Sequence, residues 1–326
     1  MYYDLKTDSF VKEETNKSLQ FMYNNVLGRV VLKMATGKPI AKVYARYMNS
    51  KHSRIKIKGF VRKNKINLEE YKDKKYTSFN DFFVREIKDG KRKIEDGLVA
   101  VCDGKLSVYR IDDESKFNIK NSIYTVEELI GENRKYKYAL VYRLCVDDYH
   151  HYIFPDDGEV VGKKHINGIL HTVQPIAQKK YKVFHENTRE ITFLNCKELG
   201  DVCYIEVGAM MIGKIVNLDK KKFKRGEEKG HFEFGGSTVI LLLNKDIKLN
   251  EKILENSEKD IETIVKLGQN IENIKIKWGG YGRKRNLCFG MWWRKNSKRR
   301  SWNEYARWCW IFCDSSCICR CWNKWV

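Results

Sequence analysis

The sequence predicts an α+β fold in which a basic helical N-terminal region precedes a β-rich domain. Two observations carry this prediction. Apolar residues recur every three to four positions within residues 1–75, and short β-branched segments separated by turn residues begin near Leu98. The chain has 326 residues and 42% hydrophobic content, which is enough for one large or two modest domains with a core.

The helical prediction for the first 75 residues rests on two stretches, 19–34 and 40–48, with Lys and Arg between the apolar positions. Gly37-Lys38-Pro39 separates them and should interrupt the helix. A basic amphipathic helix can lie on an anionic membrane, and it can equally be a surface helix packed on the domain. Both interpretations stay open. The apolar residues that would enter a membrane interface are Phe21, Val30, Val31 and Tyr44.

A short aromatic helix is expected next. Thr77-Ser78 forms a capping signal before residues 79–85, and Phe79, Phe82 and Phe83 should pack in the core. Strands follow at 98–102, 105–111, 138–146, 202–207, 212–218 and 238–243, with turn signals such as Asp103-Gly104 between them. Residues 253–267 read as a closing helix.

The last fifty residues differ from the rest. Residues 277–326 hold 12 Lys and Arg against 2 Asp and Glu, so almost half of the net charge of +21 lies there. Six of the ten cysteines and all eight tryptophans are also late in the chain. The cysteine spacing is irregular, with no nearby histidine, so no metal site is predicted. Residues 272–326 therefore form an atypical Trp/Cys/Arg-rich tail, explained by a shifted reading frame or by an appendage.

The charge suggests an acidic partner, namely nucleic acid, an anionic membrane surface or an anionic substrate. The first twenty residues lack the apolar core of a secretory signal, and no apolar stretch approaches the length of a spanning helix. Any membrane role is therefore expected to be peripheral.

The segment Phe234-Gly235-Gly236-Ser237-Thr238 is the main chemical candidate. Two glycines permit unusual backbone conformations, and a strand-like run follows the serine. The Ser237 hydroxyl could attack the Gly236 carbonyl, convert the amide to an ester and split the chain by elimination. The dehydroalanine left behind would hydrolyse to a pyruvoyl group. A Gly-Gly turn between two strands explains the same residues without chemistry.

An attacking serine needs a base, and the base needs an orienting group. Two candidate groups lie in turn-like settings before Ser237. One is Asp103 in Cys102-Asp103-Gly104, and the other is the pair of consecutive histidines, His150 and His151. Their order fits a catalytic set on neighbouring strand ends, although a histidine in such a setting can also be structural.

Residues 76–270 resemble the bacterial pyruvoyl-dependent phosphatidylserine decarboxylases, in particular the clostridial type. The matching segments occur in the family's order. They are residues 79–85, Asp103-Gly104-Lys105, 143–145, Asp148-Tyr149-His150, 187–190, Gly200-Asp201, 206–209, Lys229-Gly230 and 234–240.

The resemblance implies that Asp103, His150 and Ser237 carry out self-cleavage between Gly236 and Ser237. It implies a β chain ending at Gly236 and an α chain beginning with a pyruvoyl group derived from Ser237. Many relatives carry a second histidine where this chain has Ile153. We therefore assign the base to His150, with the adjacent His151 as the alternative.

The implied reaction converts phosphatidylserine to phosphatidylethanolamine through a Schiff base between the substrate amine and the pyruvoyl group, with no external cofactor. The implied division is a membrane-associating region at 1–75, a decarboxylase catalytic domain at 76–271 and the tail at 272–326. The β and α chains should stay associated after cleavage, and the sequence is compatible with a homodimer. The enzyme should bind the cytoplasmic face of the cell membrane as a peripheral protein.

Three alternatives stay open at this stage. The first is a pyruvoyl enzyme acting on another amino acid or lipid headgroup. The second is a basic nucleic-acid-binding protein, although nucleic acid is not the expected partner because its signal depends on the atypical tail. The third is an inactive homologue that stays uncleaved because of Ile153.

Overall fold

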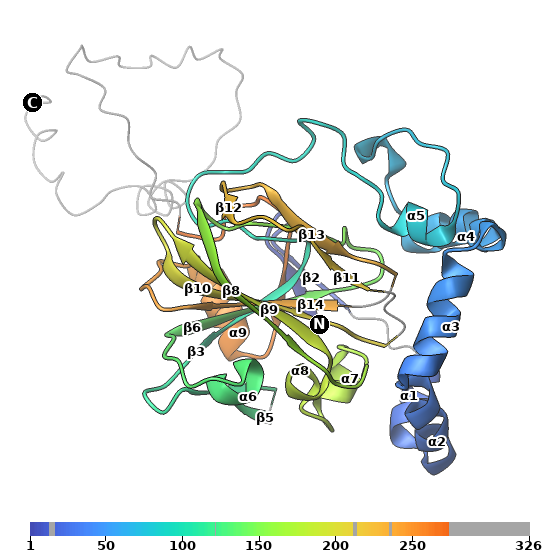
Figure 1. Cartoon of the computed structure of the whole chain (residues 1–326), viewed down its shortest axis with the longest axis horizontal. Helices are drawn as coiled ribbons and strands as arrows, with labels where there is room; N and C mark the ends of the chain where they lie inside the picture. Colours follow the sequence, from blue (N-terminus) through green and yellow to red (C-terminus); the bar gives the residue numbers. More distant parts are fainter. Residues whose placement is uncertain (13–16, 121, 211–213, 235–236, 274–326) are drawn as a thin grey trace, which may run out of the picture. The chain divides into compact units, whose positions relative to one another are not determined.

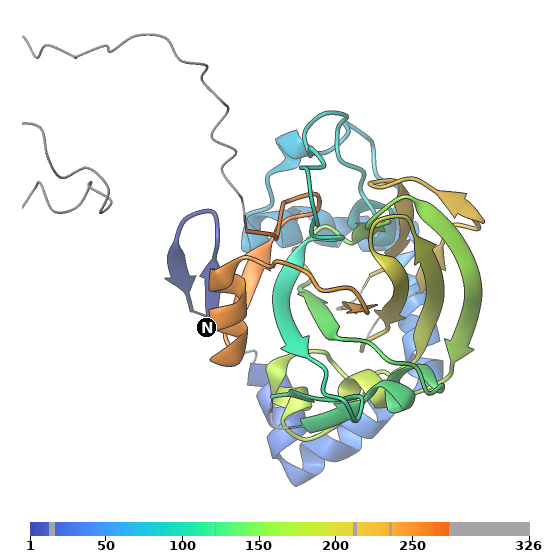
Figure 2. The ribbon, with the colours of Figure 1, turned by 90° about the vertical axis from the view of Figure 1, so that its left-hand side faces the viewer.

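A computed structural model describes residues 1–12, 17–120, 122–210, 214–234 and 237–273 (Figure 1). A ten-stranded sheet is the main element, with the strand order β12-β8-β9-β10-β14-β6-β3-β15-β1-β2. Its neighbouring strands are antiparallel except for the parallel pair β1 and β15. Figure 2 shows how strongly its strands curve. Its strands are β1 (Tyr2–Asp4), β2 (Ser9–Val11), β3 (Gly104–Arg110), β6 (Tyr138–Leu144), β8 (Gly158–Ile166), β9 (Arg189–Cys196), β10 (Gly200–Val207), β12 (Lys222–Phe223), β14 (Ser237–Leu243) and β15 (Glu262–Val265).

Two smaller sheets complete the β structure. The first has the order β11-β13-β7, and the second pairs β4 with β5. Their strands are β4 (Lys116–Ile119), β5 (Ser122–Thr125), β7 (His151–Ile153), β11 (Ile215–Asn217) and β13 (Glu228–Phe232). The first of these sheets matters for function because β7 begins at His151, directly after His150, and β13 leads toward Ser237.

From Lys17 onward the N-terminal region is helical, as predicted, whereas the strands β1 and β2 before it were not predicted. Its helices are α1 (Lys17–Asn24), α2 (Val26–Ala35), α3 (Lys38–Met48), the 3₁₀ turn η1 (Lys51–Arg54), α4 (Ile55–Asn64) and the turn η2 (Leu68–Glu70). The predicted interruption before Pro39 is present because Gly37 caps α3 and Pro39 occupies its first turn. A further break at Asn25 was not predicted. The Asn25 side chain accepts a hydrogen bond from the Leu27 backbone and so begins a new helix.

The short aromatic helix is confirmed as α5 (Phe79–Phe83), where Ser78 caps the N-terminus by accepting from the Asp81 backbone. Phe79, Phe82 and Phe83 are buried, as expected. The remaining helices are α6 (Val126–Ile130), α7 (Pro175–Gln178), α8 (Val183–Glu186) and α9 (Glu251–Glu258).

The predicted strand at 98–102 is wrong. These residues are buried, but they form isolated bridges, Val99 with Asn270 and Cys102 with Tyr152, rather than a ladder. Backbone bonds from Ala100 to Gln269 and from Ile271 to Leu98 hold the segment against the end of the described chain. The apolar composition of this segment therefore reflects its burial in the core and does not indicate a paired strand.

The predicted helix at 253–267 is half wrong. Helix α9 ends at Glu258, Asp260 adopts a positive φ of 56°, and the chain continues as strand β15. The β-branched run of Thr263, Ile264 and Val265 explains the change, because such side chains fit a pleated strand better than a helix.

The predicted α+β class is confirmed. The division into domains at residue 75 stays a prediction, and the predicted tail lies outside the described residues apart from Glu272 and Asn273. Strand β14 lies at the centre of the core, and all seven of its residues are buried. Within the described residues, no helix combines the length and the apolar character needed to cross a membrane.

Candidate active site

Ser237 is the first residue of β14, which pairs with β10 on one side and β6 on the other. The Ser237 side chain is fully buried, and its Oγ has no hydrogen-bond partner among the described residues. A buried hydroxyl without a partner is unfavourable by about 1–3 kcal/mol, so it calls for an explanation. Gly235 and Gly236, on the other side of the predicted cleavage point, lie outside the described residues.

Asp103 lies at the same end of the sheet as Ser237. Ser237 is opposite Leu144 of β6, and Lys105 of β3 is opposite Arg143, the residue before Leu144. The end of β6 therefore lies between Asp103 and Ser237. With neighbouring strands about 4.8 Å apart, two strand spacings put these backbones roughly 10 Å from each other.

Gly104 allows this close approach. It has a φ of +151°, and a Cβ at this position would lie 2.9 Å from the carbonyl oxygen of Arg143. A side chain would therefore push β3 away from β6 at the point where Asp103 enters the sheet. This is a structural reason for the Asp103-Gly104 pair that the sequence motif alone does not reveal.

The Asp103 carboxylate is buried and fully engaged. It accepts hydrogen bonds from Arg92 at 2.6 Å, from Lys266 at 2.9 Å and from the backbone of Leu267 at 2.8 Å. Burial alone would raise the pKa of Asp103, but the positive charges of Lys266 and Arg92 outweigh it and lower the pKa. Among the described residues, its hydrogen-bond partners do not include His150 or Ser237.

Asp148 connects this network to the histidine. Its carboxylate accepts from Lys105 at 2.8 Å and from the Cys145 backbone at 2.8 Å, and it lies 3.8 Å from Lys266. Lys266 therefore bridges the two buried carboxylates. Burial would raise the pKa of Asp148, but Lys105 and Lys266 lower it well below its usual range.

Sequence reasoning missed Arg92, Lys105 and Lys266 as members of this network. Lys266 stands alone between Val265 and Leu267, which are both buried. A cation in such an apolar setting is a signal of a buried partner that could have been found. Arg92 lies in a run of basic residues and offers no comparable signal.

His150 is held in one orientation. Its Nδ1 lies 2.8 Å from the backbone carbonyl of Asp148, and since a carbonyl can only accept, Nδ1 carries the proton. In the neutral ring, Nε2 then has a free lone pair, and this atom is buried without a partner among the described residues. Burial lowers the pKa of His150 to about 4, so the ring is uncharged near neutral pH and its Nε2 can accept a proton.

Helix α5 links His150 to the segment before Ser237. The ring of Phe83 lies 4.2 Å from the His150 ring and 5.1 Å from the ring of Phe234, measured between centroids. Asn80 accepts a hydrogen bond of 2.9 Å from the Phe234 backbone through its side-chain oxygen. One short helix thus fixes the imidazole and the chain three residues before Ser237.

The alternative base, His151, is engaged elsewhere. Its Nδ1 lies 2.8 Å from a carboxylate oxygen of Glu228, and its Nε2 lies 3.2 Å from the carbonyl of Val84. Neither nitrogen is left for Ser237. Ile153 is buried on β7, and its backbone donates to the carbonyl of Val101, so this position belongs to the core.

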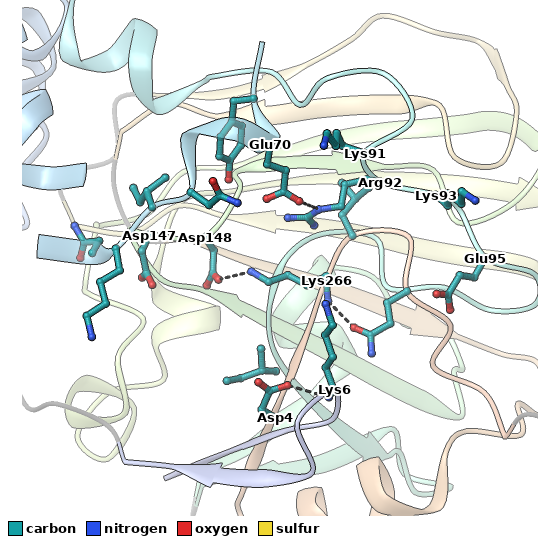
Figure 3. Close-up of a pocket in the computed structure, with 18 of the residues that line it drawn as sticks. Asp4, Lys6, Glu70, Lys91, Arg92, Lys93, Glu95, Asp147, Asp148 and Lys266 are labelled. Carbon is teal, nitrogen blue, oxygen red and sulfur yellow. Dashed lines mark hydrogen bonds and ion pairs between the residues drawn. The ribbon is translucent and has the colours of Figure 1, made fainter. Parts of the chain in front are cut away.

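A charged pocket of about 790 Å³ lies beside the network and is drawn in Figure 3. Asp148 and Lys266 form part of its wall, together with Asp147 and Arg92, and Figure 3 shows Lys266 reaching toward Asp148. Neither His150 nor Ser237 lines it. The pocket therefore gives access to the carboxylate network but is not the reaction site.

Comparisons with known proteins identify the family of the chain. The sequence profile of the family described as phosphatidylserine decarboxylase matches residues 79–272. The phosphatidylserine decarboxylase proenzyme 2 of Clostridium acetobutylicum is 49% identical over 278 residues, which cover 82% of this chain and 96% of that protein. The proenzymes of Fusobacterium nucleatum and Chlamydia caviae are 38% and 36% identical, each over 83% of this chain and 95% and 96% of their own lengths.

The predicted resemblance is thereby confirmed at a level of identity that leaves no doubt about ancestry. The matched range of this chain spans the aromatic helix α5, Asp103 and Asp148, the histidine pair and Ser237. This chain belongs to the phosphatidylserine decarboxylase family.

Proposed function

We propose that this protein is a self-processing decarboxylase that converts phosphatidylserine to phosphatidylethanolamine, with Ser237 as the source of a pyruvoyl group. One observation carries the proposal. Two buried polar atoms, Ser237 Oγ and His150 Nε2, have no hydrogen-bond partner among the described residues. Among the described residues these two atoms are bonded neither to each other nor to any other group. A nucleophile and its base must come within hydrogen-bond reach of each other, and bonds to other groups would prevent this. Their burial without partners therefore supports a precursor poised for cleavage.

In the proposed cleavage, His150 Nε2 takes the Ser237 hydroxyl proton as the oxygen attacks the Gly236 carbonyl. The amide becomes an ester, and the Ser237 nitrogen takes up a proton. Loss of the Ser237 α-proton then expels the Gly236 carboxylate, which becomes the end of the β chain. Hydration of the resulting dehydroalanine releases ammonia and leaves a pyruvoyl group at the new N-terminus. Asp148 has a positioning role through its carbonyl, which keeps the lone pair of His150 on Nε2.

Asp103 has a supporting role in this proposal. Its carboxylate neutralises Arg92 and Lys266, and Lys266 in turn lies near Asp148. Among the described residues, removing the Asp103 charge would leave Arg92 with Glu70 alone and Lys266 with only its longer contact to Asp148, in the segment that holds His150. The role is therefore electrostatic and indirect, and it differs from that of an acid bonded to the imidazole.

The residues fit the pyruvoyl group that the family implies, since the only change needed is at the buried hydroxyl of Ser237. Such a group supplies a ketone that reacts with the substrate amine and withdraws the electrons released with CO2. After cleavage, His150 is the candidate to return a proton to the former α-carbon of the substrate, because it is a histidine in the same buried site.

The strand arrangement supports continued association of the two chains. The α chain would begin with β14, which lies between β10 and β6 of the β chain. Its β15 also pairs with β3 and β1, both from the β chain. All seven residues of β14 are buried, and each large apolar side chain contributes roughly 2 kcal/mol. Separation would expose the centre of the core.

Peripheral binding to anionic lipid on the cytoplasmic side of the membrane is proposed from α2 and α3. In α3, Ile40, Val43 and Tyr47 are spaced along one face and are 45%, 68% and 40% exposed. In α2, the exposed apolar residues include Val26, Leu27, Val30, Val31 and Met34. Apolar stripes left in contact with water beside Lys and Arg are typical of helices that lie in a membrane interface. Phe21, Val30 and Val31 are exposed as that prediction requires, whereas Tyr44 packs against Phe234 and is not available.

A decarboxylation assay tests the proposed function. Purified protein should release CO2 from phosphatidylserine in mixed micelles, and free serine should give much less. His150→Gln should abolish self-cleavage, whereas His171→Gln should not, because His171 is a buried histidine bonded to Tyr23. The substrate assignment would be overturned if fully cleaved protein released no CO2 from phosphatidylserine but decarboxylated a free amino acid.

A further inference from the structure

Three side chains outside the proposed reaction gather on one face of the small sheet β11-β13-β7. His151 of β7 and His231 of β13 are directly opposite in the strand register, and their rings stack with centroids 4.9 Å apart. Glu228 is three residues before His231, a spacing that would normally turn it to the other face of the strand. The ladder shifts register between Glu228 and Gly230, and this extra residue returns Glu228 to the face of the two histidines.

The donor atoms of this cluster have the spacing of a metal site. Glu228 Oε1 lies 2.8 Å from His151 Nδ1 and 3.7 Å from His231 Nδ1, and one ligand atom from each residue lies within 4.8 Å of the others. Ligands at 2.0–2.2 Å from a tetrahedral zinc ion are about 3.4 Å apart. The observed separations lie on both sides of that value.

The hydrogen bonding of the two histidines also points to an ion. His151 Nε2 lies 3.2 Å from the carbonyl of Val84, which can only accept, so Nε2 donates to it. Nδ1 lies 2.8 Å from Glu228, and an ion bound there would take the place of the proton that these two atoms share. Metal-bound histidines commonly donate their second nitrogen to such a carbonyl. His231 Nδ1 is buried and has no hydrogen-bond partner among the described residues, because 3.7 Å to Glu228 is too long.

We propose that His151, Glu228 and His231 bind a divalent transition-metal ion, with Zn²⁺ as the expected occupant. Two imidazoles and one carboxylate form a ligand set that zinc accepts, with a fourth position for water. The side chain of Glu228 is 43% exposed and that of His231 is 23% exposed, so the cluster is open to solvent on one side. The sequence predicted no metal site because the spacing of the cysteines is irregular, and the three ligands proposed here are distant in sequence or fall on a β-bulge.

Such an ion would join two segments that matter for self-cleavage. Strand β7 directly follows His150, and β13 ends at Phe232, whose backbone donates to the carbonyl of His150. An ion bound by one residue of β7 and two of β13 would hold these two strands together after the chain is cut. All three ligands precede Gly236, so the site does not depend on cleavage or on the proposed function.

Cobalt and zinc titrations of the full chain test the site. Ser237→Ala protein, treated with a chelator and then freed of it, should bind one Co²⁺ with visible absorption typical of nitrogen and oxygen ligands. Zn²⁺ should displace the Co²⁺ and raise the melting temperature. Glu228→Gln and His231→Ala should each weaken binding by at least about tenfold. His165→Ala is the matched control, because exposed His165 pairs with Glu190 in the same way but without a second histidine.

The outcomes separate clearly. A thiolate-to-cobalt absorption band that persists in both ligand variants shows that the cobalt is bound by cysteines, and such binding alone is a result against the proposed site. Circular dichroism checks that the variants are folded, and Glu228→Gln preserves the shape of the side chain. The proposal is overturned if no one-to-one Co²⁺ or Zn²⁺ binding with nitrogen and oxygen ligands occurs, or if folded Glu228→Gln and His231→Ala bind as tightly as the parent. The cluster is then an ion pair between Glu228 and the histidines.

Discussion

The ring of Phe83 lies 4.2 Å from the imidazole of His150, measured between centroids. Phe83 also contacts Phe234, which is three residues before Ser237. A single buried aromatic side chain therefore touches the proposed base and the segment that the proposed reaction cuts. The position of helix α5 decides whether these two parts meet in the right geometry.

Phe83→Leu should slow self-cleavage while leaving the fold intact. Leucine keeps the site apolar but removes the flat face against which His150 packs. We expect roughly a tenfold or greater loss in cleavage rate, since small misplacements of reacting groups have large effects. Pulse-chase gel electrophoresis measures the rate. Phe117→Leu is the control, because Phe117 is equally buried but packs on Tyr124 away from the site. Equal cleavage rates in both variants would rule out this role for Phe83.

Asp103→Asn should destabilise the protein as well as impair cleavage. The substitution removes the carboxylate that Arg92 and Lys266 share, but Arg92 keeps its pair with Glu70 and the Lys266 side chain is 48% exposed. We therefore expect a loss of about 1–3 kcal/mol, below that for a fully buried pair. The comparison is best made in the Ser237→Ala background, where cleavage cannot change the result. Urea unfolding measures the difference. An unchanged midpoint would show that the Asp103 network contributes nothing to the fold.

Stability should fall in acid because of Glu262. Burial would raise the pKa of this carboxyl, but Arg143 and Lys120 outweigh it and lower the pKa to about 2. A carboxyl with a lowered folded-state pKa stabilises the fold fully above its unfolded value of about 4.5, and the effect is lost as the pH falls toward 2. The contribution at neutral pH is about 3 kcal/mol.

Urea unfolding at pH 6 and pH 3 measures this effect. Glu262→Gln should be much less stable than the parent at pH 6, and the gap should narrow at pH 3. Asp246→Asn is the control, since Asp246 forms an exposed pair with Lys137 and such pairs contribute little. A gap that stays constant with pH would contradict the assignment of the effect to the Glu262 charge.

Membrane binding should depend on the exposed stripe of α2 and α3. Val30→Ser combined with Val43→Ser removes two exposed apolar side chains and should weaken binding by about 1 kcal/mol for each. Flotation with vesicles rich in phosphatidylserine measures binding, and added salt should weaken it further. Ile123→Ser is the control, because Ile123 is 59% exposed on β5. If vesicle binding changes neither with the substitutions nor with salt, this surface is not the membrane-binding surface.

The sequence predicted more of the site than of its supporting network. Ser237 and His150 could be found because they lie in short motifs with recognisable chemistry. Arg92 lies in a run of basic residues and gives no signal of its contact with Asp103. The apolar neighbours of Lys266 indicate a buried partner but not which one, because Asp103 is brought to Lys266 by the pairing of β15 with β3, which are far apart in sequence. Long-range pairing of this kind leaves no local pattern.

The errors in the fold have similar causes. Residues 253–267 have enough apolar positions for a helix, and the strand at their end forms because β3 and β1 offer partners on both sides. Strands β8 and β9 were not predicted. In β8 the charged residues Lys163, Lys164 and His165 mask the alternation that a half-exposed strand would show.

Intact mass spectrometry of the purified wild-type protein and of Ser237→Ala tests the central proposal most directly. The wild type should consist of two chains that meet between residues 236 and 237, and its α chain should be lighter by one ammonia than a chain beginning with serine. Ser237→Ala should remain a single chain with the same fold. A folded wild-type protein that stays whole, or a Ser237→Ala protein that is cut at the same bond, would contradict the assignment of Ser237 as the source of a pyruvoyl group.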